Sequence, residues 1–282
     1  MADYYLARGF ACGELAQAAS ADPLLAWARH IAAQAQPEDI YRDKEGRKTL
    51  RFEYGGKPWF LKLHTGIGWP EVIKNLLQLR LPVVSARNEY RAVLALRQAG
   101  VQTLDIAAYA RQGINPAAVC SMIVTAELTA TVSLEHYCSH WAAQAPTPVI
   151  RMRLIRALAD SARRMHELGI NHRDFYLCHF HLDESSLQEP RPRCYLIDLH
   201  RAQIREHTPR RWRVKDLAGL YFSAMDCGLT RRDLLRFIRH YGVGRPRQAS
   251  DQRLWRQVER QATGLYRKAH GREPPALRAR VQ

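Results

Sequence analysis

Two short stretches past the middle of the chain each carry an aspartate, a residue type that can accept protons and bind metal ions. The first is His172-Arg173-Asp174, which directly follows a long helical pattern, and the second is Asp198, which ends an apolar run. A positioned carboxylate can accept a proton from a hydroxyl group, and a carboxylate is a good oxygen ligand for Mg²⁺. Asp174 is therefore a candidate general base and Asp198 a candidate metal ligand. Without such roles, both would be ordinary turn residues.

A lysine and a glutamate in the first third of the chain suggest a site for a phosphorylated group. Lys62 lies on an alternating, strand-like run, and Glu89 lies on the next clear helical pattern. A transferring phosphoryl group carries concentrated negative charge, so positioned cations stabilise it. We expect Lys62 to hold phosphates and Glu89 to hold Lys62 by an ion pair. The competing interpretations are a solvated strand lysine and a surface acid, with Glu71 as a rival partner.

The order, spacing and context of these residues resemble those of protein kinases. His172-Arg173-Asp174 resembles the start of the catalytic loop H-R-D-x-x-x-x-N, and Asp198 follows Asp174 by 24 residues, where kinases place the metal-binding aspartate. The resemblance implies a two-lobed fold that uses ATP and Mg²⁺. It also implies that Asp216, on a later helical pattern, braces the catalytic loop in a structural role.

The phosphate-binding part of the sequence departs from protein kinases. The chain contains no G-x-G-x-x-G loop, and only Gly46 lies where a phosphate-covering turn is expected. We therefore expect backbone amides near Gly46, or the side chain of Lys48, to bind phosphate. We also assign Glu127 to the nucleotide site.

The catalytic part departs as well, because His179 stands where the loop asparagine is expected. Imidazole is a poorer Mg²⁺ ligand than a carbonyl oxygen, so three roles are open for His179: weak metal ligand, hydrogen-bond partner of a phosphate, or packing. Asp216 follows Asp198 by only 18 residues, too few for a long regulatory loop. This argues against a protein substrate, although an atypical protein kinase or a non-catalytic, pseudokinase-like basic module remains an alternative.

Four longer strings resemble one kinase family in particular: Phe60–Trp69, Asn171–Phe180, Ile197–Gln203 and Arg211–Ala224. They resemble the lipopolysaccharide core heptose(I) kinases, the Kdo/WaaP kinase family, over about residues 38–270. The resemblance implies ATP-dependent phosphorylation of the first heptose of the lipopolysaccharide inner core, on heptosylated lipid A, with Asp174 as base. It further implies a cytoplasmic, peripheral location at the inner membrane of a Gram-negative bacterium. Acyl carrier protein is a partner suggested for the family, and no motif here argues for it.

The composition is that of a basic globular protein. Of 282 residues, 43 are Lys or Arg and 27 are Asp or Glu, which gives a formal net charge of +16. This charge favours an anionic partner, and we expect an anionic membrane surface. Nucleic acid is not expected, because no helix-turn-helix, zinc or aromatic RNA-binding signature is present. The six cysteines include no CxxC pair, which indicates reduced thiols in a cytosol.

The elements that position these residues predict an α+β chain with a two-lobed, protein-kinase-like fold. We divide it into a helical extension at 1–37, a small β-rich N-terminal lobe at 38–128 and a larger, mainly helical C-terminal lobe at 129–282. Alternating runs around Gly55-Gly56 predict a β-hairpin, and residues 145–148 mark an internal break. Helical patterns cover 70–80, 88–98, 150–168, 214–226, 230–241 and 250–267, with caps at Thr230 and Ser250. The apolar helix at 70–80 either docks at a membrane interface or faces the core.

Overall fold

The computed structural model describes residues 3–10, 15, 17–44, 46–77, 82–243 and 249–278. The chain divides into two compact units. The N-terminal unit comprises Met1–Val93 and Leu104–Glu127, and the C-terminal unit comprises Leu94–Thr103 and Leu128–Gln282. The expected α+β class is confirmed, with the larger sheet in the N-terminal unit and most helices in the C-terminal unit.

A six-stranded antiparallel sheet forms the centre of the N-terminal unit, in the order β1-β5-β6-β4-β3-β2. Its strands are β1 (Tyr4–Leu6), β2 (Ile40–Lys44), β3 (Arg47–Tyr54), β4 (Lys57–His64), β5 (Ile106–Gln112) and β6 (Cys120–Ala126). The predicted hairpin is β3–β4, in which Tyr54 pairs with Lys57 across Gly55-Gly56. Both glycines have positive φ angles, 60° and 71°, as a two-residue hairpin turn requires.

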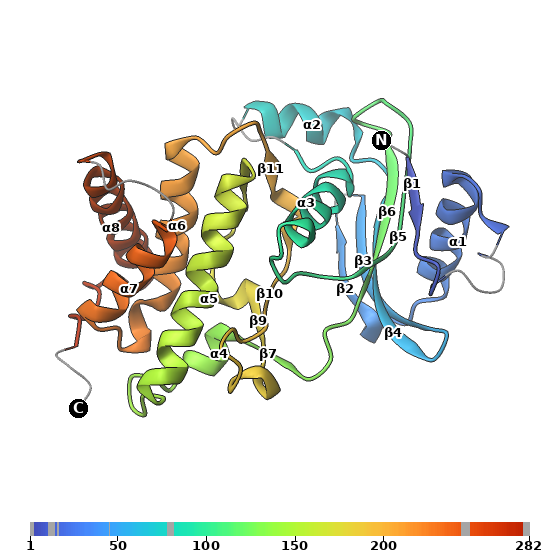
Figure 1. Ribbon diagram of the computed structural model, residues 1–282. Coiled ribbons are helices and arrows are strands. Elements are labelled where there is room, and N and C mark those ends of the chain that lie inside the picture. The colour runs from blue at the N-terminus through green and yellow to red at the C-terminus, as the bar shows by residue number, and fades with distance from the viewer. Residues whose placement is uncertain are drawn as a thin grey trace. The chain divides into compact units, whose positions relative to one another are not determined.

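Helix α1 (Ala21–Gln34) covers one face of this sheet (Figure 1). Its buried side chains share one apolar cluster with residues of β3, β4, β5 and β6. Because β1 pairs with β5 along an edge of the same sheet, residues 1–37 are not a purely helical extension. The strand Tyr4–Leu6 and α1 belong to the fold of the N-terminal unit.

Two further helices follow the β3–β4 hairpin. Helix α2 (Gly68–Leu77) begins two residues before the predicted 70–80 segment, and residues 78–80, with Leu79, lie outside the described residues. Helix α3 (Arg87–Gln98) matches its prediction within one residue. Tyr90 of α3 stacks on Tyr109 of β5, with ring centroids 4.0 Å apart. Tyr109 alternates along β5 with alanines of the α1-facing cluster, so this stack lies on the opposite sheet face.

The C-terminal unit combines helices with two small sheets. Its helices are α4 (Leu134–Cys138), α5 (Pro148–Glu167), α6 (Arg210–Ala224), α7 (Arg231–Tyr241) and α8 (Ala249–His270). Its strands are β7 (Thr131–Ser133), β8 (Ile170–Asn171), β9 (Phe180–Asp183), β10 (Cys194–Leu196) and β11 (Gln203–Ile204), in the orders β10-β9-β7 and β11-β8. Short 3₁₀ helices occupy Leu177–His179 (η3) and Leu199–Arg201 (η5).

Several predicted boundaries can be compared directly with these elements. The capping box between Thr230 and Asp233 is present at the start of α7. The predicted cap at Ser250 is wrong, because α8 begins one residue earlier, and the side chain of Ser250 lies outside the described residues. Residues 145–148 lie inside the C-terminal unit, where Thr147 caps α5. None of the helices in the described ranges combines the length and apolar character that crossing a bilayer would require.

Gly169 sets the path of the chain from α5 into the loop that carries Asp174. Its φ angle is +73°, and a Cβ atom there would lie 1.8 Å from the carbonyl oxygen of Arg205. The Gly169 carbonyl accepts a hydrogen bond from the Arg205 amide, 3.0 Å away. Only glycine fits this close approach, which lets β8 pair with β11 directly before the loop.

Candidate active site

In the N-terminal unit, Lys62 and Glu89 form a buried ion pair. Lys62 lies on β4, and its Nζ atom is 2.5 Å from Oε1 of Glu89 on α3. The side chain of Lys62 is 12% exposed and that of Glu89 is fully buried. The second carboxylate oxygen of Glu89 has no hydrogen-bond partner. A buried carboxylate is strongly destabilised without a paired cation. The ion pair with Glu89 therefore fixes the position of the Lys62 ammonium group.

The expected phosphate contact of Lys48 is contradicted by the strand register. In an antiparallel pair, residues directly opposite each other share a face, and neighbours along a strand alternate. Lys48 pairs with Leu63, which belongs to the apolar cluster under α1, whereas Thr49 pairs with Lys62. Lys48 therefore points to the sheet face opposite Lys62. Its ammonium donates to the carbonyl oxygen of Ala32, at 2.9 Å.

The other two residues assigned to the nucleotide have structural partners. Gly46 lies in the turn after β2 with a φ angle of +65°, and a Cβ atom there would be 2.0 Å from the carbonyl oxygen of Gly66. Its own carbonyl accepts a hydrogen bond from Thr65, at 2.8 Å. Glu127 accepts a hydrogen bond from Nε of Arg51, at 3.0 Å. These contacts explain the residue types, and nucleotide binding by Gly46 and Glu127 stays a prediction.

In the C-terminal unit, Asp216 fixes the backbone of the loop that carries Asp174. Its Oδ2 atom accepts a hydrogen bond from the amide of His172, and its Oδ1 atom accepts one from the amide of Arg173, both at 2.8 Å. Asp216 is 1% exposed. Arg173 has a φ angle of 78°, a strained conformation for a residue other than glycine. The bracing role expected for Asp216 is therefore present in the structure.

A second buried contact extends this brace. Nε2 of His166 on α5 donates to Oδ2 of Asp216 at 3.4 Å, and Nδ1 of His166 contacts the hydroxyl group of Tyr241 at 2.9 Å. His172 is also buried, and its Nε2 atom donates to the carbonyl oxygen of Ile197 at 2.9 Å. Burial lowers the pKa of His172 from its usual value of 6.5. These contacts hold the loop against α5, α6 and the strand that leads to Asp198.

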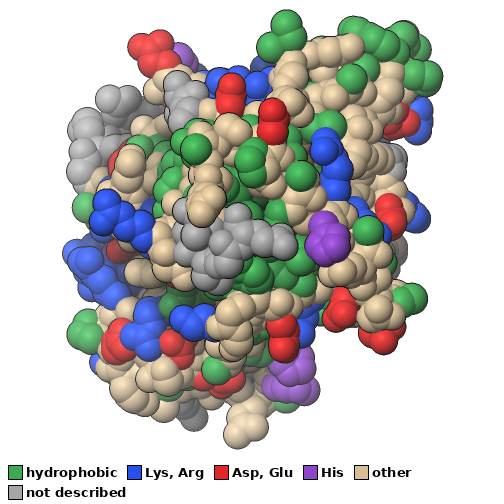
Figure 2. Space-filling view, turned by 90° about the vertical axis from the view of Figure 1, so that its right-hand side faces the viewer, with side chains coloured by type: hydrophobic (Ala, Val, Ile, Leu, Met, Phe, Trp, Pro, Cys, Tyr) green, Lys and Arg blue, Asp and Glu red, His purple; other side chains and the backbone are tan. Residues whose placement is uncertain are grey.

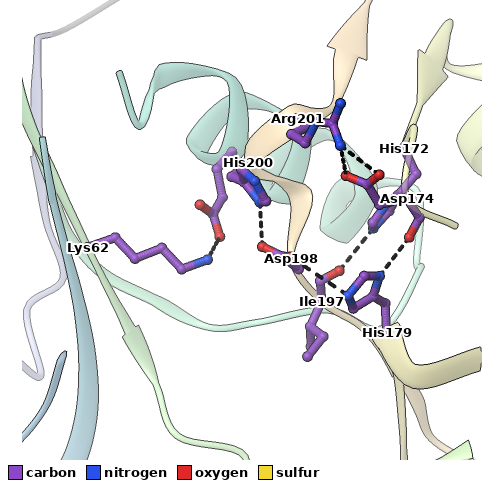
Figure 3. A network of polar contacts seen from close by, with 9 residues as sticks. Lys62, His172, Asp174, His179, Ile197, Asp198, His200 and Arg201 are labelled. Carbon is purple, nitrogen blue, oxygen red and sulfur yellow. Dashed lines mark hydrogen bonds and ion pairs between the residues drawn. The ribbon is translucent and has the colours of Figure 1, made fainter. Parts of the chain in front are cut away.

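Arg201 holds the candidate base Asp174. Its Nη1 atom lies 2.9 Å from Oδ1 and 3.0 Å from Oδ2 of Asp174 (Figure 3). The two side chains are 35% and 21% exposed, so the carboxylate is within reach of solvent. The guanidinium fixes the orientation of Asp174 and leaves lone pairs on both oxygens available for a hydroxyl proton. No local pattern in the sequence pointed to Arg201, although it lies in the family-like string Ile197–Gln203.

Asp198 has two histidine neighbours (Figure 3). His200 Nδ1 donates to its Oδ1 atom at 2.5 Å, and His179 Nε2 lies 3.7 Å from its Oδ2 atom. Asp198 has a φ angle of 62°, which turns its side chain out of the line of the preceding strand. His179 Nδ1 donates to the carbonyl oxygen of Asp174 at 2.6 Å. His179 thus connects the candidate base and the candidate metal ligand within one unit.

The contacts of His179 limit which of its two ring nitrogens could take the predicted role as a metal ligand. A hydrogen bond with the Cys178 side chain, the Asp174 carbonyl and the charge of Asp198 raise the pKa of His179 to about 9, although burial opposes them. A protonated ring nitrogen has no lone pair for a cation, so Nδ1, which donates to the Asp174 carbonyl, is not available to a metal. The contact of His179 Nδ1 with the loop backbone supports a packing and hydrogen-bonding role.

The carboxylate of Asp198 fits Mg²⁺ in the way that kinase sites use this ion. Mg²⁺ is commonly bound by one or two protein carboxylates together with phosphate oxygens and water. Within the described ranges, no group of three or more His, Cys, Asp or Glu residues forms a complete metal cage. A site that shares its metal with phosphates needs no such cage. When bound, Mg²⁺ neutralises charge on the phosphates.

Comparison with known proteins gives one consistent result. The model of the Lipopolysaccharide kinase (Kdo/WaaP) family matches residues 32–241. A Lipopolysaccharide core heptose(I) kinase WaaP of Pseudomonas aeruginosa is 49% identical over 211 residues, which cover 74% of this chain and 79% of that protein. One of Escherichia coli is 49% identical over 205 residues, covering 72% and 77%. A solved structure of WaaP in complex with acyl carrier protein is also similar, with a TM-score of 0.74 and 38% identity over 93% of this chain and 99% of that one.

Proposed function

The chain belongs to the lipopolysaccharide kinase (Kdo/WaaP) family, and on that premise we propose that it transfers the γ-phosphoryl group of ATP to the first heptose of the lipopolysaccharide inner core. The observation that carries the proposal is the Asp174 carboxylate. It is oriented by Arg201, lies on a loop braced by Asp216 and remains accessible to an acceptor hydroxyl. The 49% identity to two proteins named as heptose(I) kinases supports the heptose as the acceptor.

The chemistry we propose is a single in-line displacement. Asp174 accepts the proton of a heptose hydroxyl as the oxygen forms a bond with the γ-phosphorus. The bond between this phosphorus and the β,γ-bridging oxygen breaks, so ADP leaves with the electron pair. Arg201 keeps the carboxylate oxygens in place during the proton transfer. The products are a heptose phosphate, ADP and a proton that Asp174 later releases to water.

We assign roles in nucleotide binding to several of the predicted residues. Lys62, held by Glu89, is expected to bind the α- and β-phosphates, and Asp198 is expected to bind the Mg²⁺ that accompanies ATP. Glu127 and the backbone near Gly46 remain proposed nucleotide contacts. Lys48 is not proposed as a phosphate contact, because its side chain lies on the sheet face opposite Lys62.

The direct test is phosphate transfer from labelled ATP, with Mg²⁺, to heptosylated lipid A. We expect the wild-type protein to label this acceptor and Asp174→Ala to lose about two to four orders of magnitude in rate. Glu184→Ala is a matched control, because Glu184 is an exposed carboxylate of the same unit. Transfer that survives Asp174→Ala would contradict the assigned base. Label in total protein but not in lipid would identify a protein kinase instead.

We also propose acyl carrier protein as a partner, as in the similar solved complex of WaaP. Helices α4 to α8 enclose an apolar cavity of about 1310 Å³, lined by side chains such as Leu158, Phe237 and Trp255. A cavity of this kind suits an acyl chain better than a sugar. Acylated carrier protein should raise the melting temperature of the wild type and not that of Leu158→Trp, which would fill the cavity. Ile114→Trp, at a 92% exposed position of the other unit, should keep the response.

The proposed contact with an anionic membrane surface is supported by helix α2. Val72 faces the core and is 4% exposed, whereas Leu77 is 81% exposed, and Trp69, Ile73 and Leu76 are about half exposed. One side of the helix therefore packs in the core, and another side exposes apolar side chains to solvent, as interfacial helices do. The wild type should co-sediment with vesicles that contain anionic lipids, whereas the variant Ile73→Glu/Leu77→Glu should stay in the supernatant. Ile114→Glu serves as the control for added charge, and equal sedimentation of all three proteins would argue against docking through α2.

A further inference from the structure

Four cationic side chains surround Trp212 at the start of α6. The charged groups of Arg173, Arg205, Arg211 and Lys215 lie 5.3–5.9 Å from the centre of its ring. Cation–π contacts at this distance partly offset the repulsion between the cations. We call these four residues and the indole the Trp212 cluster.

Within the described ranges, the four cations of the Trp212 cluster lack direct carboxylate partners, although Asp174 and Asp216 attract Arg173 and Lys215 at longer range. Among the described residues, no carboxylate forms an ion pair with any of the four cations. Among the described residues, the guanidinium group of Arg205 donates to the neutral side chains of Asn171 and Gln203. The two carboxylates nearest in the fold are already engaged, Asp174 by Arg201 and Asp216 by backbone amides. On the face drawn in Figure 2, by contrast, basic and acidic side chains are interspersed.

The cations are held close enough to destabilise one another. Burial, followed by repulsion from Arg201, lowers the pKa of Arg173. Burial, followed by repulsion from Arg173 and Arg201, lowers the pKa of Lys215. A protein that folds with such an unpaired group of cations gains free energy when an anion binds among them.

The position of the cluster next to the base identifies which reactant it serves. Arg173 directly precedes Asp174 in the chain, and Arg201, which binds Asp174, is also a charged neighbour of Arg173 and Lys215. An acceptor bound with its hydroxyl group at Asp174 would therefore have these cations among its charged neighbours. Guanidinium groups bind carboxylate and phosphate through paired hydrogen bonds.

We propose that the Trp212 cluster is an acceptor subsite, which binds a carboxylate or phosphate group of an acidic saccharide and so places the neighbouring sugar hydroxyl at Asp174. This rests on the proposed function and deepens it, because it names the part of the acceptor that the enzyme recognises. Recognition of an acidic group beside the phosphorylated sugar would distinguish the true acceptor from neutral sugars.

The test compares Arg211→Gln/Lys215→Gln with Arg253→Gln/Lys268→Gln. The control pair removes the same two charges from exposed positions of α8. The acceptor is a deacylated, heptosylated core oligosaccharide, used in its native form, after carboxyl reduction and after dephosphorylation. We expect the cluster variant to raise the KM for the native acceptor by about tenfold or more, the effect of losing one or two charged hydrogen bonds. The KM for ATP, kcat and melting temperature should stay close to those of the control.

Removal of the recognised acidic group from the acceptor should raise the KM of the wild type and the control and leave that of the cluster variant unchanged. The treatment that raises the KM in this way, carboxyl reduction or dephosphorylation, identifies whether the cluster binds a carboxylate or a phosphate. If the cluster variant shows a higher KM for ATP instead, the cluster binds the nucleotide. If its acceptor KM is unchanged and its binding to anionic vesicles is lost, the cluster binds lipid. Either result would overturn the proposal. If no protein phosphorylates the native acceptor, the proposed function fails. Calorimetric binding of the native and modified oligosaccharides to the wild type and both variants then decides the subsite separately.

Discussion

The Lys62–Glu89 pair and the Asp174–Asp198 region are held in place by different means. In the N-terminal unit, the buried Glu89 carboxylate pairs with the Lys62 ammonium, and its other oxygen has no hydrogen-bond partner among the described residues. In the C-terminal unit, Asp174 and Asp198 are partly exposed, and each is oriented by basic neighbours from nearby turns. The first arrangement depends on the presence of both charges, and the second on the geometry of a braced loop.

The variant Lys62→Met should show the largest effect, a loss in the free energy of unfolding. This change leaves the charge of Glu89 buried without a cation, which costs about 3–5 kcal/mol. Urea unfolding followed by circular dichroism measures the loss. The double variant Lys62→Met/Glu89→Gln should recover most of the stability and none of the kinase activity. A single variant as stable as the wild type would show that Glu89 is not charged or not buried as described.

Asp216→Asn should produce the next largest effect, because it acts on the brace of the catalytic loop. The amide group can replace only one of the two acceptor oxygens, so one backbone N–H of the pair at His172 and Arg173 loses its partner. We expect a loss of about 1–3 kcal/mol in stability together with a fall in kcat. Glu184→Gln, at an exposed site of the same unit, is the control for both measurements. Loss of stability without loss of kcat would separate the brace from the reaction.

Arg201→Gln should affect the reaction and spare the fold. Since Arg201 and Asp174 are both partly exposed, the pair contributes little to stability. Misorientation of the base should lower kcat by about tenfold, which corresponds to 1.4 kcal/mol in the barrier. Arg163→Gln removes an ion pair of the same 2.9 Å length on α5 and should leave kcat unchanged. Equal activity of both variants would remove Arg201 from the site.

The smallest expected effect is a pH dependence caused by His172. Its pKa is lowered in the folded protein by burial, so the unfolded chain binds a proton that the folded protein does not. Stability is therefore unaffected above the unfolded value of 6.5 and falls as the pH decreases below it. The slope should reach at most about 1.4 kcal/mol per pH unit. His172→Gln should reduce this slope, whereas His270→Gln, at an exposed site, should not.

Much of the candidate site could be predicted from residue types and local patterns. The hairpin that carries Lys62, the helix that carries Glu89 and the helix that carries Asp216 follow from alternation and helical spacing. Strand β5 was not predicted, because its run Ile106–Gln112 contains three alanines and an arginine, which do not alternate in polarity. Its place in the sheet follows from pairing with β1 and β6, which are distant in sequence.

The sequence by itself determined which chemistry is available, because the types and order of Lys62, Asp174 and Asp198 are local facts of the chain. Only the tertiary structure decided which neighbours each charge meets. Strand pairing turned Lys48 away from Lys62, and the fold brought Arg201 onto Asp174 and four cations around Trp212. The physical reason is that side-chain direction and burial depend on contacts between distant segments, which local spacing does not specify.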